Sequence, residues 1–159
     1  MSSLLETLVA AVKTRLEGIL GSPGYTYTVL TVERWKHEYE GEEEFVNKVG
    51  APPAILIQTQ GGDPGDESTG TTDMVDEAIS IDIQFFLGES ANDEDKINAL
   101  ADLKKALFGS FDGYGMGAAK PRLSWRFVDL ETGVSLDGLR ATLTCTYQHD
   151  LGDPSTRTG

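Results

Sequence analysis

A hydrophobic period of two over residues 79–87 constrains the fold of this chain more than any other feature of its sequence. Five apolar side chains alternate with mostly polar ones; they are Ile79, Ile81, Ile83, Phe85 and Leu87. This spacing is typical of a β-strand with one face in a core and the other face in solvent. We therefore expect a strand that begins near Met74 and ends near Leu87.

Four further segments have the composition of strands. Residues 25–36 are rich in Tyr, Thr and Val, and residues 54–60 form a short apolar run after Pro52 and Pro53. Residues 122–129 and 138–149 alternate again. In the last segment, one face is predicted to carry Leu139, Ala141, Leu143, Cys145 and Tyr147. We expect all four segments to join the strand at 74–87 in one sheet.

The connection at residues 61–73 is unusually long and polar. It contains no apolar residue able to fold it back onto a core, and hairpin loops commonly have about two to five residues. The pattern predicts a loop that either has a function or is disordered. A charged run at residues 37–44 is likewise predicted to be a solvated loop.

Two segments show helical periodicity. Residues 4–20 place apolar side chains at spacings of three and four, and Ser3 and Glu6 have the spacing of a capping box. In the second segment Asn92 or Asp93 is the expected N-cap, and Gly109 is the expected stop. Its predicted buried stripe consists of Ile97, Leu100, Leu103, Leu107 and Phe108.

The order of these elements predicts an α+β fold. We expect a mostly antiparallel sheet of about five strands with two helices packed on one face, in the order α-β-β-β-α-β-β. A single domain would span residues 1–150, and residues 151–159 would form a flexible C-terminal tail.

Composition excludes several classes of function. The 159 residues include 13 basic and 26 acidic side chains, so the net charge of -13 should repel nucleic acid and anionic membranes. The single cysteine, Cys145, excludes an internal disulfide and fits a reducing cytoplasm. Lys13 and Arg15 interrupt the apolar N-terminal segment, so neither a signal peptide nor a membrane-spanning helix is expected.

The motifs that could carry chemistry fail on spacing. Asp63, Asp66, Glu67 and Asp73 supply carboxylates for a cation, but the glycine and glutamate that a calcium loop requires are replaced by Ser68 and Met74. Cys145 and His149 lie too far apart along one strand to act as nucleophile and base. We therefore predict no catalytic residues, no metal site and no cofactor.

A small basic patch is predicted on one face of the last two strands. Arg122, Arg126 and Arg140 would lie there, either exposed or in ion pairs within or between subunits. Trp125 and Trp35 are expected to pack in a core or at an interface.

The pattern of elements resembles the tail-terminator or tail-completion proteins of long-tailed bacteriophages. The segments that carry the resemblance are the helix at 4–20, the strands at 52–57, 79–87 and 139–147, the helix at 97–108 and the polar tail. The resemblance covers nearly the whole chain and rests on the pattern rather than on one motif.

The resemblance implies a structural virion protein rather than an enzyme. Such proteins form rings, commonly hexameric, that cap the tail tube, end its polymerisation and contact head-completion or neck proteins. DNA would pass through the lumen without specific binding, and the protein would be assembled in the host cytoplasm and located in the virion. Contacts between subunits and with the tube would involve loops and strand edges, here residues 38–44, 61–73 and 109–120. The expected contact residues are Glu42, Glu43, Asp63, Asp66, Glu67, Asp73, Arg126 and Arg140.

Two alternatives stay open. The chain could be another head-tail connector or a tail tube protein; of these, a tube protein would extend into open polymers rather than close into a ring. It could also be a small enzyme or ligand-binding domain whose site combines residues distant in sequence.

Overall fold

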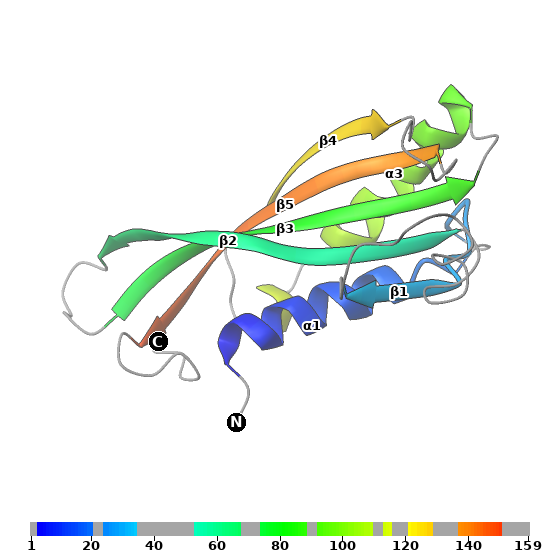
Figure 1. Ribbon diagram of the computed structural model, residues 1–159. Helices are drawn as coiled ribbons and strands as arrows, with labels where there is room; N and C mark the ends of the chain where they lie inside the picture. Colours follow the sequence, from blue (N-terminus) through cyan, green and yellow to red (C-terminus); the bar gives the residue numbers. More distant parts are fainter. Residues whose placement is uncertain are drawn as a thin grey trace.

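The computed structural model describes residues 3–20, 24–34, 53–67, 74–88, 92–109, 113–115, 121–128 and 137–150. Within these ranges, two α-helices, a 3₁₀ turn and five strands follow one another (Figure 1). They are α1 (Leu4–Glu17), β1 (Thr31–Arg34), β2 (Ala54–Glu67), β3 (Met74–Gly88), α3 (Asp93–Phe108), η1 (Gly113–Gly115), β4 (Arg122–Val128) and β5 (Asp137–Asp150).

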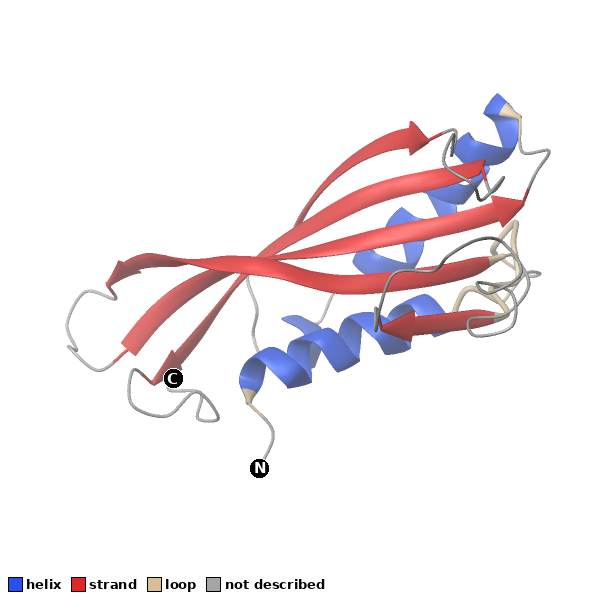
Figure 2. Ribbon diagram, in the orientation of Figure 1, coloured by secondary structure: helices blue, strands red, loops and turns tan. Residues whose placement is uncertain are grey.

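The strands form one sheet in the order β1-β2-β3-β5-β4. β1 pairs with β2 in parallel, and the other three pairings are antiparallel. Both helices lie against the same face of this sheet (Figure 2), which we call the inner face. The predicted α+β fold and the order of its elements are confirmed.

The first helix begins and ends for local reasons. The side chain of Ser3 accepts a hydrogen bond from the backbone N–H of Glu6 at 3.2 Å. Glu6 does not complete the expected capping box, because its carboxylate pairs with Arg34 of β1 at 2.7 Å. The helix ends at Glu17, three residues before the predicted end at residue 20, and Gly18 is its C-cap. Leu20 is exposed and forms an isolated bridge with Thr28.

The second helix has a complete capping box. Asn92 and Asp95 exchange side-chain and backbone hydrogen bonds at 2.9 and 3.0 Å, so the prediction of Asn92 as a possible N-cap is confirmed. Gly109 is the C-cap, as predicted. The predicted stripe was wrong at Ile97, which is 51% exposed, because Lys96 and Ala99 occupy the buried side of that turn.

The core lies between the helices and the inner face of the sheet. Residues at alternate positions of β2, β3 and β5 meet there; they are Ile55, Ile57, Ile79, Ile81, Ile83, Phe85, Leu139, Ala141, Leu143, Cys145 and Tyr147. The alternation predicted for residues 79–87 and 138–149 is therefore confirmed. The opposite face, the outer face, carries Asp82 and Gln84 of β3 beside Arg140 and Thr142 of β5.

The first strand is shorter than predicted. It begins at Thr31 rather than at Tyr25, because the segment before it is bound to a helix side chain instead of a strand. Asp102 of α3, 4% exposed, accepts the backbone N–H groups of Thr26 at 2.9 and 3.0 Å and of Tyr27 at 2.8 Å. The Asp102 carboxylate thus replaces the strand-to-strand hydrogen bonds that the β-strand composition of residues 25–30 favours.

Candidate functional site

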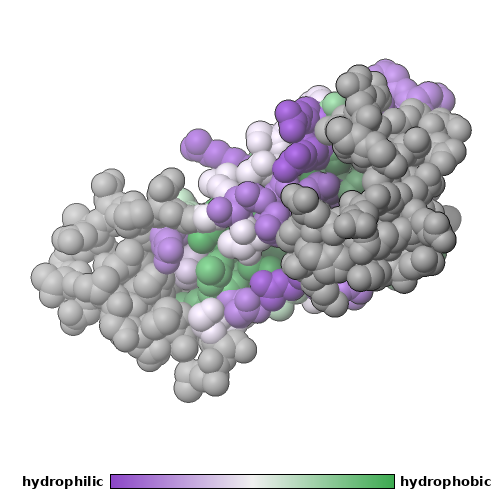
Figure 3. Space-filling model, in the orientation of Figure 1, coloured by the Kyte–Doolittle hydropathy of each residue, from purple (hydrophilic) through white to green (hydrophobic). Residues whose placement is uncertain are grey.

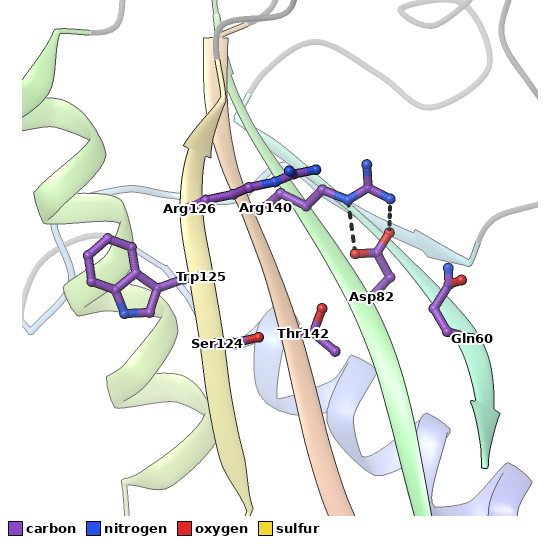
Figure 4. Close-up of a pocket in the computed structure, with 7 residues that line it drawn as sticks. All are labelled: Gln60, Asp82, Ser124, Trp125, Arg126, Arg140 and Thr142. Carbon is purple, nitrogen blue, oxygen red and sulfur yellow. Dashed lines mark hydrogen bonds and ion pairs between the residues drawn. The ribbon is translucent and has the colours of Figure 1, made fainter. Parts of the chain in front are cut away.

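The outer face of the sheet carries a groove, which we call the arginine groove. It has a volume of about 390 Å³ and is open to solvent. Its lining comes from β2, β3, β4 and β5 and consists of Gln60, Asp82, Ser124, Trp125, Arg126, Arg140 and Thr142 (Figure 4). The period of two in β3, β4 and β5 explains the polar part of this lining, because the apolar positions of these strands, including Trp125 opposite Ala141, belong to the inner face.

A buried carboxylate lies at the base of the arginine groove. Asp82 is 4% exposed and accepts two hydrogen bonds from Arg140, from Nε at 3.2 Å and from Nη2 at 3.0 Å. Gln84 donates a third at 3.3 Å. A bidentate pair of this kind satisfies a carboxylate that would otherwise be costly to bury. Ion pairing within the chain, one of the two possibilities for the basic patch, is therefore confirmed for Arg140.

Arg126 is directly opposite Arg140 in the register of β4 and β5. Its side chain is exposed and extends over β5 toward Arg140 (Figure 4). Among the residues that the structure describes, none forms an ion pair or hydrogen bond with the Arg126 guanidinium. Two like charges directly opposite each other destabilise an antiparallel pair, and Asp82 offsets only one of them.

Trp125 lies at the margin of the arginine groove and points toward α3 (Figure 4). Trp125 is 46% exposed, with the Lys104 ammonium 5.8 Å and the Phe127 ring centroid 5.2 Å from its ring centroid. It is therefore not a core residue, and packing at an interface stays a prediction for it. Trp35 lies outside the described residues.

Three strands continue past the N-terminal end of α1 (Figures 1 and 2). We call this part the sheet extension and define it by register as residues 63–67 of β2, 74–78 of β3 and 146–150 of β5. β1 pairs only with residues 54–57 of β2, and β4 pairs only with residues 138–144 of β5. No described strand therefore pairs with either outer edge of the sheet extension.

The structure corrects the prediction of a loop at residues 61–73. Residues 61–67 belong to β2 and pair with β3, with register shifts at Thr59/Gly61 and Pro64/Glu67. Asp63, Asp66 and Glu67 therefore lie on a strand, although their segment is rich in glycine and polar residues. Pairing with the regular strand β3 outweighs the weak strand propensity of that composition. Gly61, at the first register shift, has φ of 154°. Irregularities of this kind accommodate glycine and proline at the edge of a sheet.

The predicted contact residues have different outcomes. Arg126 and Arg140 lie together in the arginine groove, and Asp63, Asp66 and Glu67 lie in the sheet extension, farther along β2 than Gln60. Glu42, Glu43 and Asp73 lie outside the described residues, as does most of the predicted loop at 109–120. Asp82 and Gln60 were not predicted as site residues from the sequence. For Asp82, the available signal was a carboxylate between Ile81 and Ile83 in a regular strand.

The side chains near Cys145 are suited to packing rather than to catalysis. The Cys145 thiol is buried, and burial raises its pKa to about 11. Burial, followed by the charge of Glu77, raises the pKa of Tyr147 to about 12, and its hydroxyl donates to Glu77 at 3.2 Å. A protonated thiol is a poor nucleophile near neutral pH. Over the described ranges, no three His, Cys, Asp or Glu residues cluster in a way that could hold a metal ion.

A second hollow lies between α1, α3 and the segment before β1. Its two cations already bind carbonyl groups: Arg15 donates to Ala106 and Gly109 at 3.2 and 2.8 Å, and Lys105 donates to Gly24 at 2.6 Å. Arg15 thus binds carbonyl groups at the C-terminal end of α3, and Lys105 binds a carbonyl group of the segment before β1. The hollow is therefore part of the packing of α1 against α3.

No protein-family model matches this chain, and no curated protein matches it either. In the described part of the chain, no helix is both long enough and apolar enough to span a membrane. Hydrophilic residues cover much of the middle of the described surface in Figure 3, with smaller apolar areas between them.

Proposed function

We propose that this chain is a structural virion protein of the tail-terminator type. In this role it forms a closed ring, commonly of six copies, that caps the tail tube, ends tube polymerisation and joins the tail to head-completion or neck proteins. The resemblance of the sequence supports this role, and the α+β order that the resemblance implies is the order of the fold.

The sheet extension is the observation that carries the proposal. Its two outer edges present backbone N–H and C=O groups that no described strand binds, and such edges pair readily with strands of another chain. On β2, Pro64 and two register shifts disturb the edge, whereas β5 pairs regularly with β3 through to Asp150. The β5 edge is therefore the better surface for pairing with a neighbouring subunit.

The charge of the chain supports the same role. A net charge of -13 would keep DNA from adhering to the lumen of a ring through which it must pass. The described side chains also favour a structural role over an enzymatic one. Cys145 is buried and protonated near neutral pH, and the buried carboxylates of Asp82 and Asp102 already accept hydrogen bonds from Arg140 and from backbone amides.

Native mass spectrometry of the purified protein, alone and with tail tubes, tests the proposal. We expect one closed oligomer of fixed stoichiometry that binds tube ends. A strictly monomeric protein that does not bind tubes would contradict the proposal. The unpaired edges also favour a second candidate, a tail tube protein or another head-tail connector; open polymers without fixed stoichiometry would identify a tube protein.

Shortening the extension gives a second test. Because residues 63–67 pair with β3, a deletion of residues 63–72 removes paired strand as well as connection. Deleting residues 68–72 alone spares these pairs. We expect the shorter deletion to weaken assembly with little change in the unfolding temperature, measured by native mass spectrometry and circular dichroism. Lost thermal stability with unchanged assembly would show a structural role instead.

A further inference from the structure

We propose that the arginine groove binds a carboxylate side chain from residues 63–73, which we call the β2–β3 segment, of a second copy of this chain. The inference rests on the proposed ring and names one side-chain contact between its subunits, in addition to pairing at the β5 edge. The candidate carboxylates are Asp63, Asp66, Glu67 and Asp73.

The charge of the arginine groove differs in sign from that of the whole chain. Two arginines and one aspartate line it, which leaves one net positive charge on a molecule with a net charge of -13. Asp82 is the one carboxylate in the described lining, and Arg140 binds it through two N–H groups. The Arg126 guanidinium is therefore the cation available to an incoming anion.

The lining suits a carboxylate better than an apolar ligand. The hydroxyls of Ser124 and Thr142 and the amide of Gln60 lie on the same face as Arg126 (Figure 4). A guanidinium binds a carboxylate with planar, charge-assisted hydrogen bonds, and neighbouring hydroxyls can donate to the same oxygens. An incoming carboxylate would also relieve the repulsion between Arg126 and Arg140, which are opposite each other in the ladder.

The segment cannot easily reach the arginine groove of its own subunit. Gln60 lines the groove, and β2 continues from there to Glu67 as an extended strand. Arg126 is in register with Gln84 of β3 through Arg140, whereas Asp63 and Glu67 lie opposite Ala78 and Val75. Six and nine residues at about 3.3 Å each separate these registers by roughly 20 and 30 Å along the strands. Folding back would break the pairing of residues 63–67 with β3. A second copy can present the same residues without this loss.

The resulting contact joins two different surfaces. The sheet extension of one subunit binds the outer face of the next, so each subunit is both donor and acceptor. Contacts of this head-to-tail type generate closed rings when the rotation between subunits closes. The inference is therefore compatible with a closed ring.

Charge reversal tests the contact. Arg126→Glu should raise the protein concentration required for half assembly at least tenfold in native mass spectrometry, while circular dichroism stays that of the folded protein. Adding Asp63→Lys, Asp66→Lys, Glu67→Lys and Asp73→Lys to the same chain should restore assembly. Arg122→Glu is the matched control, because Arg122 is also exposed on β4 but does not line the arginine groove. Arg126→Gln removes the charge without adding one.

The outcomes separate this inference from the proposed function. A wild-type ring that persists unchanged in Arg126→Glu overturns the inference and leaves the proposed function intact. If Arg126→Glu abolishes assembly and the lysine substitutions do not restore it, the β2–β3 segment is overturned as the occupant. Wild-type protein that never assembles, even on tail tubes, overturns the proposed function and the inference together.

Discussion

Replacing Asp102 by alanine should destabilise the fold more than any other single change to a charged side chain discussed above. The Asp102 carboxylate accepts backbone N–H groups of Thr26 and Tyr27 across 2.8 to 3.0 Å. These bonds attach residues 24–30 to α3 and so position the chain that enters β1. Alanine leaves both amides without their acceptor.

The expected loss follows from those two amides. A buried donor that loses its partner costs about 1–3 kcal/mol, and partial access of water to this segment favours about 1–1.5 kcal/mol for each amide. Asp102→Ala should therefore reduce the free energy of unfolding by about 2–3 kcal/mol. For a domain of this size the unfolding temperature would fall by about 4–12 °C. Asp102→Asn keeps one acceptor oxygen and should lose about half as much.

Thermal and urea unfolding followed by circular dichroism measure these losses. Glu94→Ala, an exposed change in the first turn of the same helix, is the control and should cost about 0.5 kcal/mol. Hydrogen exchange should accelerate at the amides of Thr26 and Tyr27 in the alanine variant. An unfolding free energy equal to that of the control, with unchanged exchange at both amides, would refute the reasoning.

Three further predictions concern the sheet. Arg140→Ala leaves the buried Asp82 carboxylate poorly compensated and should cost about 2 kcal/mol in urea unfolding, whereas Arg126→Ala should cost less than about 0.5 kcal/mol. Cys145, with a pKa raised to about 11 by burial, should resist a thiol reagent at pH 8 in the folded protein and react once per chain after unfolding. Tyr147 has a folded pKa of about 12 against an ordinary 10.0, so its contribution to stability is full below pH 10.0 and lost as the pH rises toward 12. Tyr147→Phe should therefore reduce the decline in unfolding temperature across that range; an unchanged decline would contradict this assignment.

The sequence by itself determined the elements and the inner face of the sheet. The alternation at residues 79–87 and 139–147 predicted which side chains enter the core, and Asn92 and Gly109 predicted the ends of α3. These features depend on neighbours a few positions away, so the local pattern contains the necessary information. The resemblance to tail terminators added a function that no local chemistry indicates, and that function stays a prediction.

Only the tertiary structure decided how distant residues meet. Pairing with β3 made residues 61–67 a strand despite their composition, and Asp102 kept residues 25–30 out of the sheet. The register of β4 against β5 placed Arg126 opposite Arg140, and the register of β3 against β5 brought Asp82 beneath them. Each of these contacts joins residues far apart in the chain. Their energies depend on pairing and burial that exist only once the sheet has formed, so a pattern of neighbouring residues could not reveal them.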